Sequence, residues 1–400
     1  MQQTATDQPS PTALVLTGGG ARAAYQVGAL RAINEFMPPY CGNPFSIICG
    51  TSAGGLNAVG LAVNAACFGD GVAKLEEIWG DFSCEQVFRT DWPGVLSSAF
   101  RWLSNLAFGL YNRADPVSLL DNAPLAALLT KTLNLKSLPS VIESGHLRAL
   151  CITACSYSRG DSTSFYQGAD DLIDWQRARR RGIKTTLEIE HLMASAAIPL
   201  LFPSVRINNE YYGDGALRQL APVSPALHLG ARRILVIGSG RGESVQVRRM
   251  ADGYPSLAQI LGQIMNSSFV DSLEMDLERL SRINKTLGLL TPEQLAAHTT
   301  LRPVEHLVLS PSVERLEELA SRYAHELPRS IRLFVRGSGM FKRAGSNLLS
   351  YLLFEKSYTR AVMQLGYDDA REREIELRQF LQPELAPHSN VVNFMRPIKA

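Results

Sequence analysis

Short apolar runs and amphipathic segments alternate along the first half of the chain. Residues 13–17 (ALVLT) form an apolar run that ends in three glycines, and a helical pattern follows to about Phe36. A second apolar run, residues 45–49 (FSIIC), leads through a turn of small residues into an apolar helix over residues 56–67. This order of strand, turn and helix predicts an α/β fold with a central, mostly parallel sheet.

The same periodicities extend the prediction to the rest of the chain. Further strands are expected at residues 147–155, 164–167, 233–238 and 305–310, and helices at residues 187–197, 223–229 and 257–280. From about Pro311 the pattern is helical and more charged. We therefore expect a loose N-terminal tail over residues 1–11, an α/β domain over residues 12–310 and a helical C-terminal region over residues 311–400.

Composition narrows the function classes. The 400 residues carry 40 Lys and Arg against 38 Asp and Glu, a net charge of +2, which disfavours a nucleic-acid binder. No apolar run approaches the roughly 20 residues of a membrane span, and the polar start lacks the features of a signal peptide. The six cysteines and seven histidines show no metal-ligand spacing. These observations predict a cytoplasmic protein that needs no metal or other cofactor.

The turn after the second apolar run carries a candidate nucleophile. Residues 50–54 read Gly-Thr-Ser-Ala-Gly, the G-x-S-x-G pattern of a nucleophile elbow. The small residues Gly50 and Gly54 allow a strained strand-to-helix turn that exposes the hydroxyl of Ser52 at the carboxyl edge of the sheet. An unrelated tight turn is the alternative.

The glycine turn after the first apolar run allows two interpretations. A G-x-G-x-x-A pattern fits a dinucleotide-binding turn, but the next strand does not end in the acidic residue that would hold the ribose. Alternatively, unobstructed backbone amides of this turn form an oxyanion hole beside Ser52. That interpretation, which we favour, uses Gly18, Gly19, Gly20 and Ala21.

A serine nucleophile needs a base, and the sequence offers two kinds. Histidine is the usual base, but Ser52 comes earlier in the chain than in α/β-hydrolases, and no histidine lies in an evident functional turn. Asp214 lies between two glycines in what we expect to be a loop after an apolar strand. A Gly-Asp-Gly turn is by itself only weak evidence for a base.

Four ordered blocks resemble patatin-like phospholipases of the bacterial type. They are the glycine triplet with Arg22, the elbow, the stretch Ala194–Pro199 and the Asp214-Gly215 pair, and together they span roughly residues 13–238. The resemblance implies a three-layer α/β fold and a dyad in which Ser52 is the nucleophile and Asp214 the base. It gives Arg22 a role in orienting phosphate or in bracing the glycine loop, and Ser195 a supporting role.

The chain departs from the family pattern at two positions. Ala23 follows Arg22 where the family often has glycine, and Ala216 follows Gly215 where the family often has a second glycine. Both changes add only a methyl group, so they affect the expected loop conformation and substrate preference more than the chemistry.

Three segments are candidates for lipid contact. Aromatic residues are dense between Trp79 and Tyr111, which is typical of a lid, a membrane-contacting helix or ordinary core. A basic cluster between Arg177 and Lys184 could meet anionic headgroups or form a solvated helix face. Residues 346–358 could cap an acyl groove or form a homodimer contact.

These features together predict a serine esterase that cleaves fatty-acyl esters of phospholipids or lysophospholipids in transient contact with a membrane surface. An acyltransferase with the same acyl-enzyme and a non-catalytic lipid-binding regulator are the alternatives. The expected peripheral membrane contact rests on local features, because the net charge is close to zero.

Overall fold

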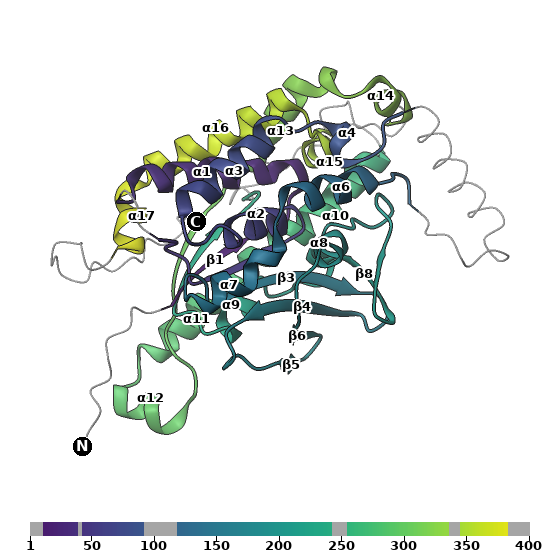
Figure 1. Ribbon diagram of the computed structural model, residues 1–400. Coiled ribbons are helices and arrows are strands. Elements are labelled where there is room, and N and C mark those ends of the chain that lie inside the picture. Colours follow the sequence, from purple (N-terminus) through teal and green to yellow (C-terminus); the bar gives the residue numbers. More distant parts are fainter. Residues whose placement is uncertain (1–10, 39–41, 92–117, 242–253, 336–344, 383–400) are drawn as a thin grey trace.

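The computed structural model describes residues 11–38, 42–91, 118–241, 254–335 and 345–382 (Figure 1). In these residues ten strands form one sheet, in the order β10-β9-β1-β2-β3-β4-β6-β5, with β8 pairing β3 and β7 pairing β8. The strands are β1 (Thr12–Leu16), β2 (Ile47–Thr51), β3 (Ala149–Ser156), β4 (Asp161–Gly168), β5 (Trp175–Arg177), β6 (Arg180–Lys184), β7 (Val205–Ile207), β8 (Glu210–Asp214), β9 (Arg233–Ile237) and β10 (Glu305–Leu309).

The sheet is mostly parallel, as the sequence predicted. Strands β10, β9, β1, β2 and β3 run in one direction, and β4 pairs with β6 in parallel. The antiparallel pairs join β3 to β4, β3 to β8, β5 to β6 and β7 to β8. Helices cover both faces and complete a three-layer α/β arrangement, with α1, α2 and α16 on one face and α9 and α11 on the other (Figure 1).

The described helices follow the sequence pattern with local differences. They are α1 (Ala24–Phe36), α2 (Ala53–Ala62), α3 (Phe68–Gly80), α4 (Cys84–Val87), α6 (Ala123–Thr132), α7 (Leu138–Glu143), α8 (Ile189–Ser195), α9 (Ser224–His228), α10 (Leu257–Asn266), α11 (Ser272–Leu287), α12 (Pro292–His298), α13 (Val313–Tyr323), α14 (Arg329–Val335), α15 (Ser346–Leu352), α16 (Lys356–Glu372) and α17 (Glu374–Leu381). The single helix expected over residues 257–280 is α10 and α11, joined by a π-helical turn over Ser267–Asp271.

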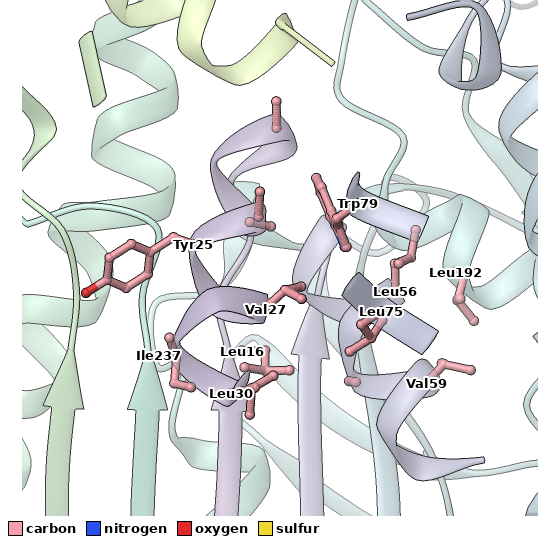
Figure 2. Packing of buried hydrophobic residues seen from close by; sticks show 14 of the residues in the cluster. Leu16, Tyr25, Val27, Leu30, Leu56, Val59, Leu75, Trp79, Leu192 and Ile237 are labelled. Carbon is pink, nitrogen blue, oxygen red and sulfur yellow. The ribbon is translucent and has the colours of Figure 1, made fainter. Parts of the chain in front are cut away.

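Alternation along the central strands divides the core in two. Leu14 and Leu16 of β1 belong to the larger cluster with α1, α2 and α3, whereas Ala13 and Val15 belong to the cluster with α9 and α11. Figure 2 shows the larger cluster, with Leu16 next to Leu30 of α1. Because both faces of the central strands are buried, their sequences read as continuous apolar runs.

The C-terminal helices pack directly on the α/β part of the chain. Helix α16 lies along α1, where a Cβ on Gly28 would overlap the backbone of Met363 and a Cβ on Gly366 would overlap the backbone of Tyr25. The Tyr25 hydroxyl also donates to Asp369 Oδ2 at 2.8 Å. The region after residue 311 therefore contributes to the main core, and the domain boundary at residue 310 stays a prediction.

No helix in the described ranges combines the length and the apolar character that crossing a membrane requires.

Candidate functional site

Ser52 lies at the sharp turn between β2 and α2. Its backbone has φ 54° and ψ −130°, a conformation with positive φ that residues other than glycine seldom adopt. A Cβ on Gly54 would lie 2.5 Å from the carbonyl oxygen of Thr17, so only glycine lets the first turn of α2 pack against the end of β1. Gly50 is similarly close to the backbone of Gly54. The local structure is a strained strand-to-helix turn, the geometry that a nucleophile elbow requires.

Asp214 is the last residue of β8, not a loop residue as the sequence had suggested. It ends a strand because its neighbours pair with β3, with Tyr212 opposite Ser156 and Asp214 opposite Ala154. Its backbone amide donates to the carbonyl oxygen of Ala197 at 2.9 Å. The expectation of a loop was wrong because a short strand with two exposed or polar positions has little apolar signal.

Strand β3 brings Ser52 and Asp214 together. Strand β4 pairs with the whole length of β3, so β2 and β8 must share the other edge of β3. Strand β2 ends on that edge with Thr51 opposite Thr153, and β8 occupies the next position with Asp214 opposite Ala154. The serine that follows Thr51 therefore meets the aspartate at the same point of the sheet.

Ser195 fixes this junction through two hydrogen bonds. Its hydroxyl accepts from the Ser52 amide at 2.8 Å and donates to the carbonyl oxygen of Thr153 at 2.6 Å. Gln219, which the sequence reading had missed, accepts from the Thr51 hydroxyl at 2.8 Å. The stretch that contains Ser195 and Ala197 thus contacts the backbones of both Ser52 and Asp214, in line with the supporting role expected for it.

Burial favours the protonated form of the Asp214 carboxyl. The residue is 1% exposed, and this burial raises its pKa from 3.8 to about 7, against the hydrogen bonding of the Ser52 side chain and the Ala216 amide. Oδ1 accepts from Ala216 at 3.0 Å, while Oδ2 has no described partner of regular hydrogen-bond geometry. Contacts between a nucleophile and its base commonly tighten only when substrate binds.

The glycine loop lies directly beside the elbow. A Cβ on Gly18 would be 3.0 Å from the Cβ of Ser52, and Gly20 lines the same pocket as Ser52. Gly20 has φ 52°, and a side chain there would overlap the carbonyl oxygen of Tyr351. Within the described ranges, the amides of Gly18 and Gly19 donate to no backbone oxygen.

Further groups hold this loop in place. Ala21 is fully buried at the start of the 3₁₀ turn Gly20–Ala23. The Ser239 hydroxyl donates to the carbonyl oxygen of Gly18. Sequence reasoning missed Ser239, although its position in a Gly-Ser-Gly turn just after β9, at the carboxyl end of a parallel strand, was an available signal.

Arg22 is fully buried beneath α15. Its guanidinium donates to the hydroxyls of Ser350 and Tyr351 at 2.7 and 3.0 Å, and to Asn347 Oδ1 at 3.1 Å. Its Cζ also lies 3.8 Å from the centre of the Tyr351 ring. Of the two roles expected for Arg22, these contacts support bracing of the glycine loop over binding of phosphate.

An apolar pocket of about 40 Å³ adjoins Ser52. Its lining comes from several elements and includes Leu56, Trp79, Phe82, Leu192, Phe202 and Phe354. This volume is well below the roughly 300–1,000 Å³ of small-molecule sites, so a larger apolar ligand would require the lining side chains to move apart.

The three lipid-contact candidates have different outcomes. Trp79, Phe82 and Phe88 are core residues with 2% exposure or less, and residues 92–117 of the aromatic stretch lie outside the described residues. Helix α15 is buried within the chain and Phe354 lines the pocket, which supports a cap over the groove more than a dimer contact. The helix interpretation of the basic cluster is wrong, because Arg177 and Arg180 lie in the β5–β6 hairpin.

The described histidines do not take part in this arrangement. The backbone amide of Glu188 donates to His191 Nδ1 at 3.0 Å, at the start of α8, and His228 packs against Trp175. No described histidine is hydrogen-bonded to Ser52 or Asp214. Among the described residues, Asp214 is the titratable group that interacts with the Ser52 side chain.

Residues 14–227 match the family described as patatin-like phospholipase. The cGAMP-activated phospholipase of Pseudomonas aeruginosa is 26% identical over 224 residues, which are 56% of this chain and 57% of that protein. The cGAMP-activated phospholipase of Escherichia coli is 34% identical over 98 residues, 23% of this chain and 26% of that protein. The chain thus aligns with little more than half the length of the first relative and about a quarter of the second.

Similar solved structures include human GIVD cytosolic phospholipase A2, with a TM-score of 0.46 and 11% identity over 95% of this chain and 61% of that chain. VipD from Legionella pneumophila has a TM-score of 0.32 and 13% identity over 90% of this chain and 67% of that chain. The family match covers more than half of the chain and includes both Ser52 and Asp214. The chain therefore belongs to the patatin-like phospholipase family.

Proposed function

We propose that the protein is a serine acyl hydrolase that cleaves fatty-acyl esters of phospholipids or lysophospholipids through Ser52 and Asp214. The observation that carries the proposal is the buried Asp214 carboxyl, which meets the elbow serine at the edge of β3 and has a pKa of about 7. A carboxylate with that pKa is a competent general base near neutral pH.

The geometry supports a two-step reaction. Asp214 takes the proton of the Ser52 hydroxyl as Oγ attacks the acyl carbonyl carbon, and the loop of Gly18, Gly19, Gly20 and Ala21 offers amides to the oxyanion. The ester C–O bond then breaks, and the alcohol leaves with the proton from Asp214. A water molecule then gives a proton to Asp214 as its oxygen attacks the acyl carbonyl carbon. The bond between Ser52 Oγ and the acyl carbon breaks, Ser52 takes the proton back from Asp214, and the fatty acid is released.

A lipid panel tests this proposal. We expect the wild-type protein to release free fatty acid from phospholipid or lysophospholipid vesicles, as measured by mass spectrometry. The panel includes parallel samples with cGAMP, because both curated relatives are named as cGAMP-activated.

The lipid products distinguish hydrolysis from acyl transfer and from lipid binding without catalysis. Acyl groups that appear on a second lipid, with little free fatty acid, would establish an acyltransferase. If no lipid is consumed with or without cGAMP, while the protein still binds vesicles, the protein is a lipid-binding regulator and the proposal fails.

A further inference from the structure

A second, basic hollow lies at the β5–β6 hairpin. It has a volume of about 500 Å³ and is open to solvent, within the range of small-molecule sites. Four arginines line it, with Asp161 as the one carboxylate among its lining residues. The arginines are Arg159, Arg177, Arg179 and Arg180.

The nearby carboxylates are already paired. Glu210 forms ion pairs with Arg159 at 2.8 Å and Arg181 at 2.6 Å, and Asp161 lies 3.5 Å from Arg181. Within the described ranges, Arg177, Arg179 and Arg180 have no ion pair within 4 Å. The hollow therefore carries a net positive charge, although the Asp276 carboxyl also interacts electrostatically with Arg180.

The backbone concentrates this charge. Arg177 and Arg180 are directly opposite each other across the hairpin, an arrangement that costs stability for like charges. Arg179 has φ 57°, which forms the tight turn between them. The Nε of Arg180 is buried without a hydrogen-bond partner in the described part of the chain. The pKa of the adjacent His228 falls to about 4, mainly through burial and further through Arg177 and Arg180.

The hollow opens at the end of the sheet that is formed by the carboxyl ends of β2 and β3, which is also where Ser52 lies. Arg180 pairs with Ser162 at the start of β4, and Asp161 pairs with Ser156 at the end of β3. Strand β6 lies three strand positions away from β2 in the sheet, which corresponds to a lateral separation of roughly 14 Å. That distance suits the headgroup of a neighbouring lipid better than the phosphate of the lipid being cleaved.

Arg218 connects the two sites. It lies four residues after Asp214, next to Gln219, which contacts Thr51 of the elbow. Its Nη2 would be 3.9 Å from a Cβ on Gly160, a residue that lines the hollow. Exposed cations thus extend from the vicinity of Asp214 to the hairpin.

Exposed apolar side chains accompany the cations on this edge. Leu220 is 63% exposed and follows Gln219, and Leu200 is 52% exposed between the pocket residues Ile198 and Phe202. A site for a free phosphate needs no such neighbours, whereas a lipid surface presents both phosphate groups and acyl chains.

We propose that the arginine hollow and Arg218 bind phosphate groups of anionic phospholipids and thereby hold the edge of the sheet that carries Ser52 against the lipid surface. That the bound phosphate groups belong to lipids rests on the proposed function, but the binding of phosphate itself does not require ester cleavage. With a net charge of only +2, the protein depends on this local cluster for electrostatic attraction.

Vesicle co-sedimentation of the full-length protein tests the proposal. The test variant is Arg177→Gln/Arg179→Asn/Arg218→Gln, with asparagine at position 179 because it tolerates a positive φ. Its apparent affinity for phosphatidylcholine vesicles containing phosphatidylglycerol is expected to fall at least about tenfold, since each arginine near an anionic surface contributes about fivefold. Binding to phosphatidylcholine alone should change little.

The matched control replaces three exposed arginines that lie elsewhere, Arg282→Gln/Arg322→Gln/Arg329→Gln. Equal losses in the two triple variants, or no loss in the test variant, would overturn the proposal. A soluble glycerophosphate that binds the hollow in calorimetry, without an effect of the test variant on vesicle binding, would overturn the lipid source. Hydrolysis of a soluble short-chain ester should be the same in the test variant and wild type, and its absence from the wild type would count against the proposed function alone.

Discussion

Replacement of Ser52 by alanine is expected to lower kcat for fatty-acid release at least about 10³-fold, with little loss of stability. The physical reason is that the Ser52 hydroxyl is the proposed nucleophile, whereas the other hydroxyl of the elbow, on Thr51, donates to Gln219. The variant therefore retains substrate binding without a nucleophile. Alanine keeps the Ser52 amide, which donates to Ser195, so the elbow should keep its shape. The measurement is the steady-state rate on lipid vesicles, together with urea unfolding.

Ser144→Ala is the matched control, because Ser144 is exposed at the end of α7 and its hydroxyl donates only to a nearby carbonyl oxygen. It should retain the wild-type rate. A Ser52→Ala protein that remains folded and retains more than a tenth of the wild-type rate would show that Ser52 is not the nucleophile.

Replacement of Asp214 by asparagine is expected to lower kcat by about 10³- to 10⁴-fold, because the amide cannot take the proton of Ser52. In the wild type, kcat/KM on a soluble ester should rise with pH and level off above a midpoint near 7, the pKa of the buried carboxyl. The Asp214→Asn protein should show no such titration in its residual rate. The measurement is the pH–rate profile of both proteins.

Asp214 also makes stability depend on pH in a predictable direction. Between pH 3.8 and about 7 the folded state keeps Asp214 protonated while the unfolded state ionises it, so the folded state binds more protons. The free energy of unfolding of the wild type should therefore fall as the pH rises through this window, by at most about 4 kcal/mol. Asp214→Asn lacks this loss, and its stability relative to the wild type should rise from pH 5 to pH 8.

Asp368→Asn, an exposed substitution on α16, serves as the control and should show a nearly constant difference from the wild type over the same pH range. If the difference between Asp214→Asn and the wild type also stays constant, the carboxyl does not have a raised pKa in the folded protein.

The parallel core of the fold is predictable because its central strands β1, β2, β3 and β9 are buried on both faces. Strands β1, β2, β3, β9 and β10 read as apolar runs, and each was expected within three residues of its observed bounds. Strands β5, β6 and β7 were missed, and β8 was expected only as an apolar strand before Asp214 without bounds, because all four are short and half exposed. Pairing stabilises them more than their own composition does: β6 pairs with β4, β8 with β3, β5 with β6 and β7 with β8. The basic hairpin was mistaken for a helix face for the same reason.

Part of the candidate site can likewise be predicted from the sequence, and part cannot. Motifs identify Ser52, Asp214 and the glycine loop, because each needs particular small residues next to a reactive group. The sequence does not show that β8 continues the edge of β3 beyond β2, which is what brings the serine and the aspartate together. Nor does it show that Asn347 and Ser350, more than 300 residues away in sequence, surround Arg22.

The most direct test of the Ser52–Asp214 dyad is the labelling of the protein with a fluorophosphonate as a function of pH. Peptide mass spectrometry should place the adduct on Ser52, with a labelling rate that rises with pH around a midpoint near 7 and is nearly abolished in Asp214→Asn. An adduct on another serine, or a rate on Ser52 that is the same in Asp214→Asn as in the wild type, would contradict the account.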